Sequence, residues 1–132
     1  MPRYMLDTNM CIYLIKNQPE SVRQRFAQCY VGDVVMSAIT FAELEYGVAA
    51  STNPKRERKN LANLVEDIPV VPFDDAACVA YGPIRMATRS IKKDALDKLI
   101  AAHSVSLNVT LVTNNERDFS KYPGVVLENW LS

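Results

Sequence analysis

Four acidic residues stand at positions from which their carboxylates could meet. Each one either follows a short apolar segment or lies in the first turn of a predicted helix; they are Asp7, Glu43, Asp97 and Asp118. The carboxyl ends of the strands of an open parallel sheet meet at one edge, and ligands bind in the crevice there. We therefore expect these four side chains to converge on one crevice.

Carboxylates gathered in this way repel one another, so their pKa values rise unless cations neutralise them. The chain has one His and three widely spaced Cys, which leaves oxygen atoms as the available ligands and makes Mg²⁺ or Mn²⁺ the expected ion. Such an ion activates water and stabilises the charge that develops on a phosphoryl group. The predicted chemistry is hydrolysis of a phosphodiester.

Further polar and basic side chains are predicted near these acids. Three neutral residues at the same edge could support the metal ligands: Asn9, Thr113 and Asn115. Four cations just before Asp97 could hold a phosphate backbone: Arg85, Arg89, Lys92 and Lys93. The Lys55–Lys59 run is typical of a solvated helix face, and His103 lies on an apolar helix stripe, as core histidines do.

Helix capping is the alternative explanation for three of the acids. Thr40–Glu43 fits a capping box, while Asp94–Asp97 and Asn115–Asp118 each place acidic residues at a helix start. Asp7 differs, because it directly follows an apolar strand where a carboxylate without a partner is costly. For Asp7 the sequence favours a function, and for the other three both interpretations stay open.

Short apolar segments alternate with longer segments of helical period. The predicted strands are Tyr4–Leu6, Val34–Ser37, Pro69–Phe73, Thr110–Thr113 and Val125–Leu127. The predicted helices cover 9–16, 19–29, 40–50, 54–66, a segment from 74 to about 89, 94–107 and 115–119. Strands separated by helices imply a mainly parallel sheet covered on both faces, so we expect one α/β domain over residues 1–132.

Composition excludes several classes of protein. The 132 residues carry 15 Lys and Arg against 15 Asp and Glu, so a nucleic acid must be met by a local basic patch. A single His excludes a ribonuclease with paired histidines, and the scattered Cys give no zinc site. The Cys pattern, with no apolar signal segment and no long apolar run, leads us to expect a cytoplasmic protein without membrane contact.

Five motifs occur in an order that resembles one protein family. They are Met5–Asn9, Ser37–Gly47, Asp97–His103, Val112–Phe119 and Pro123–Trp130. Together they resemble the PIN-domain toxins of the VapC type over essentially the whole chain.

The resemblance implies a three-layer PIN fold and an endoribonuclease that depends on Mg²⁺ or Mn²⁺. It implies the toxin half of a toxin–antitoxin pair, which cuts structured RNA to inhibit translation, with the anticodon stem-loop of initiator tRNA as the expected target. Relatives form homodimers, and an antitoxin whose tail fills the acidic groove silences them. A homodimer or a larger assembly with an antitoxin is therefore expected.

By position, the resemblance makes Asp7 and Asp97 the principal metal ligands. It matches Glu43 and Asp118 to the other two acidic positions of the family, and Asn9, Thr113 and Asn115 to its polar helpers. The segment before the third acid lacks the usual Gly/Pro loop, which leaves Asp94 open as an alternative to Asp97. Asn115 stands where many PIN domains have Asp, which favours a single metal ion.

Two other classes of function are alternatives. A phosphoryl-transfer domain that forms an aspartyl phosphate would use a second Asp two residues after Asp7, where this chain has Asn9. A non-catalytic module that binds RNA or protein would use the acids only as helix caps. The residue pattern and the family resemblance lead to the same hypothesis. A metal site activates water to cleave RNA and leaves 5′-phosphate and 3′-hydroxyl ends.

Overall fold

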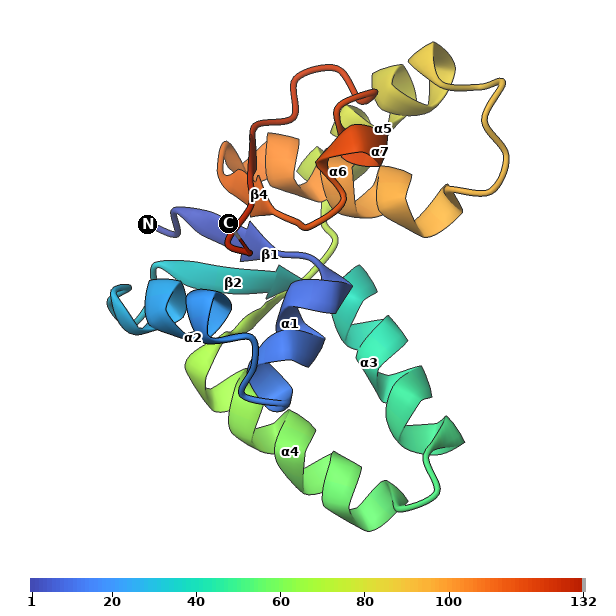
Figure 1. Cartoon of the computed structure of the whole chain (residues 1–132). Coiled ribbons are helices and arrows are strands. Elements are labelled where there is room, and N and C mark those ends of the chain that lie inside the picture. Colours follow the sequence, from blue (N-terminus) through green and yellow to red (C-terminus); the bar gives the residue numbers. More distant parts are fainter. Residues whose placement is uncertain (132) are drawn as a thin grey trace.

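A five-stranded parallel sheet forms the centre of the chain in this computed structural model, which describes residues 1–131 (Figure 1). The strands are β1 (Tyr4–Leu6), β2 (Val34–Ser37), β3 (Val70–Val71), β4 (Thr110–Val112) and β5 (Leu127–Glu128). Their order is β3-β2-β1-β4-β5, and every pairing is parallel. The parallel α/β architecture predicted from the sequence is confirmed. Ser132, the last residue of the predicted domain, lies outside the described residues.

Helices cover both faces of this sheet. They are α1 (Thr8–Ile15), α2 (Glu20–Ala27), α3 (Ala38–Ala50), α4 (Pro54–Asp67), α5 (Asp75–Ala87), α6 (Ala95–Leu107) and the short α7 (Glu116–Phe119). Apolar residues of α1 to α4 pack on one face, except Ile39 at the start of α3, which packs with those of α5 to α7 on the other. In Figure 1 the first group lies below the sheet and the second above it.

Adjacent residues of each central strand point into opposite cores, as the two-residue period of a strand requires. Met5 of β1 belongs to the core under α5 and α6, and its neighbour Leu6 to the core under α1 to α4. Leu111 and Val112 of β4 divide in the same way. Because both faces are buried, these strands are mostly apolar, and their polar residues, such as Ser37 of β2 and Thr110 of β4, stand at the first or last position.

The start of α3 differs from the predicted capping box. Ser37 is the N-cap and accepts a hydrogen bond from the backbone of Ile39, at 3.0 Å. Thr40 lies inside the helix, fully buried, and its hydroxyl has no hydrogen-bond partner within residues 1–131. The capping box, which was the alternative explanation for Glu43, is therefore wrong, because the N-cap is Ser37, three residues before Thr40.

Two edge strands are shorter or later than predicted. β3 keeps only Val70 and Val71, since the flanking Pro69 and Pro72 have no N–H for the ladder. β5 begins at Leu127, where it pairs with Leu111 of β4. Of the three central strands, which carry the candidate site, β1 and β2 have the predicted bounds, and β4 ends at Val112, one residue before the predicted Thr113.

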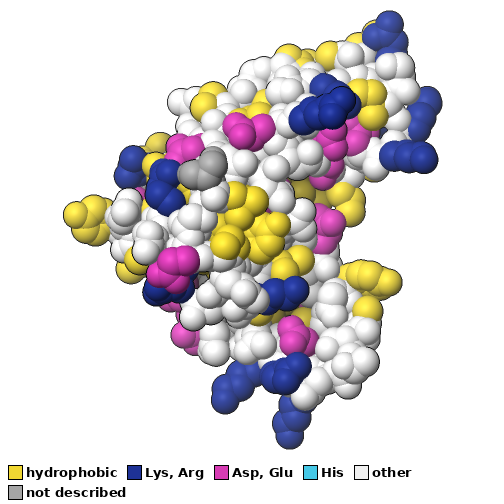
Figure 2. Space-filling model, viewed as in Figure 1, with side chains coloured by type: hydrophobic (Ala, Val, Ile, Leu, Met, Phe, Trp, Pro, Cys, Tyr) yellow, Lys and Arg dark blue, Asp and Glu magenta, His cyan; other side chains and the backbone are white. Residues whose placement is uncertain are grey.

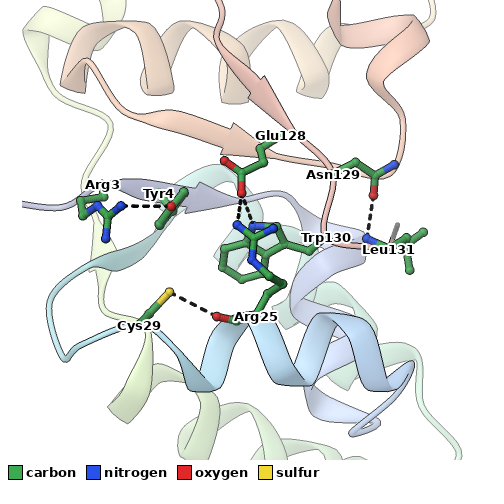
Figure 3. A network of polar contacts seen from close by, with 8 residues as sticks. All are labelled: Arg3, Tyr4, Arg25, Cys29, Glu128, Asn129, Trp130 and Leu131. Atoms are coloured by element: carbon green, nitrogen blue, oxygen red, sulfur yellow. Dashed lines mark hydrogen bonds and ion pairs between the residues drawn. The ribbon is translucent and has the colours of Figure 1, made fainter.

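The C-terminal residues bind the sheet to α2 (Figure 3). Trp130 is fully buried, and its indole N–H donates to Oε1 of Glu128 at 2.9 Å. Arg25 of α2 donates to the same carboxylate, and its guanidinium lies over the Trp130 ring, 5.4 Å from the centroid. Tyr4 meets the ring edge-on at 5.4 Å. The C-terminal end of the chain is thus fixed to β1 by Trp130 and to α2 by Trp130 and the Arg25–Glu128 ion pair.

Within residues 1–131 we find no helix with the length and apolar character needed to cross a membrane.

Candidate active site

A pocket of about 190 Å³ opens at the carboxyl end of β1. It is lined by Asp7, Thr8, Asn9, Glu43, Asp97, Ile100, Asn115 and Phe119. These residues come from the end of β1, the start of α1, helix α3, helix α6 and the segment after β4. Three of the four predicted acids therefore share one cavity, which we call the acid pocket.

Asp7 is the most buried of these acids, with 5% of its surface exposed. Its Oδ1 accepts a hydrogen bond from the backbone N–H of Met10 at 3.0 Å, so the same carboxylate caps α1. Burial raises the pKa of Asp7 above its ordinary value, and the Glu43 carboxylate adds to the rise. Hydrogen bonds from Thr113 and from the backbone of Met10 and Asn9 oppose this rise in pKa without reversing it.

Thr113 is fully buried beside Asp7 and does not line the pocket. Its hydroxyl also accepts the backbone N–H of Asn115 at 2.9 Å. The predicted helper residues thus divide: Asn9 and Asn115 line the cavity, and Thr113 supports Asp7 from behind.

Glu43 is held by a residue that the sequence analysis missed. The Thr8 hydroxyl donates to Oε1 of Glu43 at 2.7 Å, across 35 positions of sequence. This bond leaves Oε2 of Glu43 as the oxygen free of that contact. The only sequence signal for Thr8 is its place directly after Asp7, within the Met5–Asn9 motif.

Asp97 lies on the first turn of α6 and is half-buried in the pocket. Its pKa is raised from 3.8 to about 6, first by burial and then by the charges of Glu43 and Asp7, with smaller effects from Asp94 and Asp118. A cation placed between this carboxylate and its neighbours would stabilise their ionised forms and lower the pKa of Asp97.

Asp94, the alternative third acid, has a different environment. One oxygen accepts the hydroxyl of Tyr122 at 2.6 Å, and the other lies 3.1 Å from the ammonium of Lys98. Desolvation alone would raise the pKa of Asp94, but these two partners outweigh it and the net shift is downward. Asp94 therefore fixes the start of α6, and Asp97 is the acid that faces the pocket.

Asp118 is at the rim and does not line the cavity. Its side chain is 53% exposed and accepts a hydrogen bond from the Asn115 amide at 2.9 Å. Asp118 thus reaches the pocket through Asn115, while its charge still contributes to the raised pKa of Asp97.

The predicted basic residues lie beside the acid pocket in two groups. Arg85, Arg89 and Lys92 line a neighbouring hollow, and Lys93 lines a third one together with Glu43 and Asp97. Figure 2 shows Lys and Arg side chains gathered at the upper right, at the end of the molecule that carries α5, with acids beside them.

His103 is a core residue, as the sequence analysis predicted. It is fully buried, its Nδ1 lies 2.7 Å from the Ser37 hydroxyl, and its ring packs edge-on against Phe73. It does not line the acid pocket.

The donor set suits a hard divalent cation. Within residues 1–131 no three acidic, His or Cys side chains stand close enough to bind one ion together. Mg²⁺ is commonly held by one or two carboxylates and retains several waters. Asp7 and Asp97 meet that requirement, because both line the acid pocket and both have raised pKa values. The other polar groups of the pocket are neutral oxygens, amides and the Glu43 carboxylate.

The raised pKa of Asp97 predicts a measurable pH dependence of stability. Between pH 3.8 and about 6 the folded chain keeps a proton that the unfolded chain loses, so stability falls as pH rises through this range. In EDTA, Asp97→Asn should therefore exceed the wild type at pH 7 by about 1 kcal/mol, or about 3 °C, after allowance for solvent screening of a half-buried group. The advantage should vanish near pH 4.

Thermal unfolding from pH 4 to pH 8 measures this difference. Glu66→Gln, at an exposed position of α4 outside the pocket, is the control for loss of one charge. An Asp97→Asn variant no more stable than the wild type at neutral pH would contradict the prediction.

Comparison with known proteins first gives the family. The family model of the PIN domain matches residues 4–125, which include the four strands β1 to β4. The chain therefore belongs to the PIN domain family.

The full-length relatives are of the VapC type, as the motifs predicted. The chain is 39% identical over 132 residues to the tRNA(fMet)-specific endonuclease VapC of Shigella flexneri and 36% identical to that of Salmonella typhimurium, with 98% of this chain and 99% of each relative covered. It is also similar to a protein in the crystal structure of DNA-bound VapBC from Salmonella typhimurium, with a TM-score of 0.90, 36% identity, and 98% and 99% of the two chains covered.

Proposed function

We propose that this protein is the endoribonuclease toxin of a toxin–antitoxin pair and that its activity depends on Mg²⁺ or Mn²⁺. The observation that carries the proposal is the convergence of Asp7, Glu43 and Asp97 in one pocket, where burial and mutual repulsion raise the pKa of Asp7 and of Asp97. The names of relatives at 36% and 39% identity, which are endonucleases, support RNA as the substrate.

Asp7 and Asp97 are the proposed metal ligands. When bound, the ion neutralises the crowded carboxylates, lowers the pKa of water and offsets charge on the phosphoryl oxygens. Asp7 is pre-positioned for this role, because the N–H of Met10 fixes one of its oxygens. Asp97 lies in the first turn of α6, which the Lys98–Asp94 contact helps to fix.

Glu43 is the proposed proton acceptor for the attacking water. The hydrogen bond from Thr8 occupies Oε1 of Glu43, so Oε2 is the oxygen that would accept the proton. Asn115, oriented by Asp118, presents its side chain to the same pocket. Water attacks the phosphorus, the bond from phosphorus to the ribose 3′-oxygen breaks, and that oxygen takes up a proton. The downstream fragment then carries a 5′-phosphate and the upstream fragment a 3′-hydroxyl.

The proposed target is a structured RNA, with the anticodon stem-loop of initiator tRNA first among candidates. Support comes from the relatives named for tRNA(fMet). The balanced net charge of the chain gives little attraction for arbitrary RNA, so selectivity must come from the shape of the target.

A cognate antitoxin is the proposed protein partner, and a homodimer the proposed state of the toxin itself. The VapBC complexes of two organisms, to which this chain is similar in structure, support the first. The acid pocket, with its unpaired carboxylate at Asp97, offers a binding place for a basic side chain of such a partner.

Removal of divalent cations tests the proposal. Incubation of the purified chain with initiator tRNA and Mg²⁺ should yield fragments with 5′-phosphate and 3′-hydroxyl ends, and excess EDTA should reduce cleavage to background. Ligation-based sequencing of the RNA ends reads both the position and the end chemistry. Undiminished cleavage in EDTA, or 2′,3′-cyclic phosphate ends, would reject the proposed mechanism. An absence of both RNA cleavage and Mn²⁺-induced stabilisation would favour a non-catalytic module.

A further inference from the structure

Three hollows lie in series along the start of α6. The acid pocket shares Glu43 and Asp97 with a hollow of about 260 Å³ that Lys93 also lines. That hollow shares Asp94 and Ala95 with a third, of about 250 Å³. We call the third hollow the basic pocket. The shared residues place the three hollows next to one another along the start of α6, in a row that we call the track.

The basic pocket is strongly positive, although the chain as a whole is neutral. Arg85, Arg89, Lys92 and Lys98 line it, against one acid, Asp94. The segment from position 76 to position 93 contains four cations and no acid. The charge of Asp94 is already matched, since its carboxylate lies 3.1 Å from the Lys98 ammonium. The charges of the other three cations are therefore available to an anion.

Two of these guanidinium groups are held in place before any ligand arrives. Arg89 donates to the backbone carbonyl of Met86 at 2.8 Å. Arg85 lies over the ring of Tyr81, 6.0 Å from the centroid, and contacts its hydroxyl at 3.5 Å. A preorganised guanidinium loses less conformational entropy on binding a phosphate, which it can meet with two parallel hydrogen bonds.

A buried lysine fixes the segment that carries the pocket. Lys98 is 5% exposed, and its ammonium donates to the carbonyls of Thr88 at 3.0 Å and Ile91 at 2.7 Å. Together with the Asp94 contact, these bonds hold the α5–α6 connection against the first turn of α6. The basic pocket therefore keeps a set position relative to Asp97, which lies one residue before Lys98.

We propose that the basic pocket binds a backbone phosphate of the RNA that neighbours the scissile phosphate in the acid pocket. This inference rests on the proposed function, and it assigns a second contact point to the same substrate. Asp94 and Asp97 lie about one helical turn apart, so the two pockets are adjacent along the track. Phosphate contacts of this kind set the register of a nucleic acid without reading its sequence.

The test measures RNA binding separately from cleavage. An Asp7→Asn chain is titrated with a labelled RNA hairpin that has the anticodon stem-loop sequence of initiator tRNA, at several salt concentrations. Addition of Arg85→Gln, Arg89→Gln and Lys92→Gln should weaken binding by about tenfold and reduce the slope of log K against log salt by at least about 0.7. Because phosphate contacts do not depend on sequence, the hairpin need not be the natural target.

Arg3→Gln is the control for loss of a cation outside the basic pocket, since Arg3 lies exposed just before β1, at the opposite edge of the sheet. In chains that keep Asp7, the triple variant should raise KM about tenfold and leave kcat near that of the Arg3→Gln chain. If the hairpin is bound but never cleaved, the phosphate site stands and the proposed nuclease function fails. Equal affinity and equal salt slope in the triple variant and the Arg3→Gln control would overturn the inference, even if the triple variant lost an acidic protein partner.

Discussion

Replacement of Asp7 by asparagine is expected to lower the rate of RNA cleavage by about 10³-fold and to leave the fold intact. The loss follows from the removal of a proposed metal ligand that no other acid can replace, since Asp97 and Glu43 approach the pocket from other elements. The fold should survive because an Asn oxygen can accept the Met10 N–H, as Asp7 does at 3.0 Å. The neutral amide also avoids the cost of burial that raises the pKa of Asp7.

Cleavage assays under single-turnover conditions, combined with thermal unfolding in EDTA, separate the two effects. Asp67→Asn, the same substitution at an exposed position at the end of α4, should match the wild type in both measurements. A fully active Asp7→Asn enzyme would exclude Asp7 from the site. An inactive but unfolded variant would show instead that the cap on α1 is its essential role.

Trp130→Ala is expected to cause the largest loss of stability, about 3–5 kcal/mol or about 10–15 °C in Tm. The indole is fully buried, so its removal leaves a cavity between β1 and α2. It also leaves Glu128 without the indole N–H at 2.9 Å and removes the ring over which Arg25 lies. Figure 3 shows Glu128, Arg25 and the Trp130 ring side by side. Small domains have only about 5–15 kcal/mol of total stability, so a large share would be lost.

Denaturant unfolding of the purified variants gives the free energies. Trp130→Phe should lose less, because the phenyl ring keeps most of the packing against Tyr4 and gives up only the N–H and part of the volume. A Trp130→Ala chain as stable as Trp130→Phe would show that ring packing contributes little and would contradict the prediction.

The acid pocket could be predicted because each of its acids interrupts a pattern. The apolar Tyr4–Leu6 strand stops abruptly at Asp7, and the rule for parallel sheets places strand ends of this kind at one edge. The structure gathers Asp7, Glu43 and Asp97 there, as expected. It leaves Asp118 at the rim, because the single turn of α7 points that side chain outward.

The contacts that position these acids could not be predicted in the same way. The hydrogen bond from Thr8 to Glu43 joins elements 35 positions apart, and the Tyr122–Asp94 contact spans 28 positions. The burial of Lys98 could not be predicted from the sequence either, because a lysine in the first turns of a helix is usually exposed to solvent. Such pairings follow from packing of the finished fold and leave no periodic signal.

The order of strands in the sheet has a consequence for synthesis on the ribosome. The central strand β1 is synthesised first, yet it pairs with β4. Tyr4 therefore cannot pair with Thr110 until most of the chain has been synthesised. Asp97 and Asn115 also belong to the last third of the chain, and Trp130, which packs against Tyr4 and Arg25, is synthesised after them. Pairings of such long sequence separation form late in folding. A nascent chain therefore has no complete acid pocket until the last third of its sequence has left the ribosome.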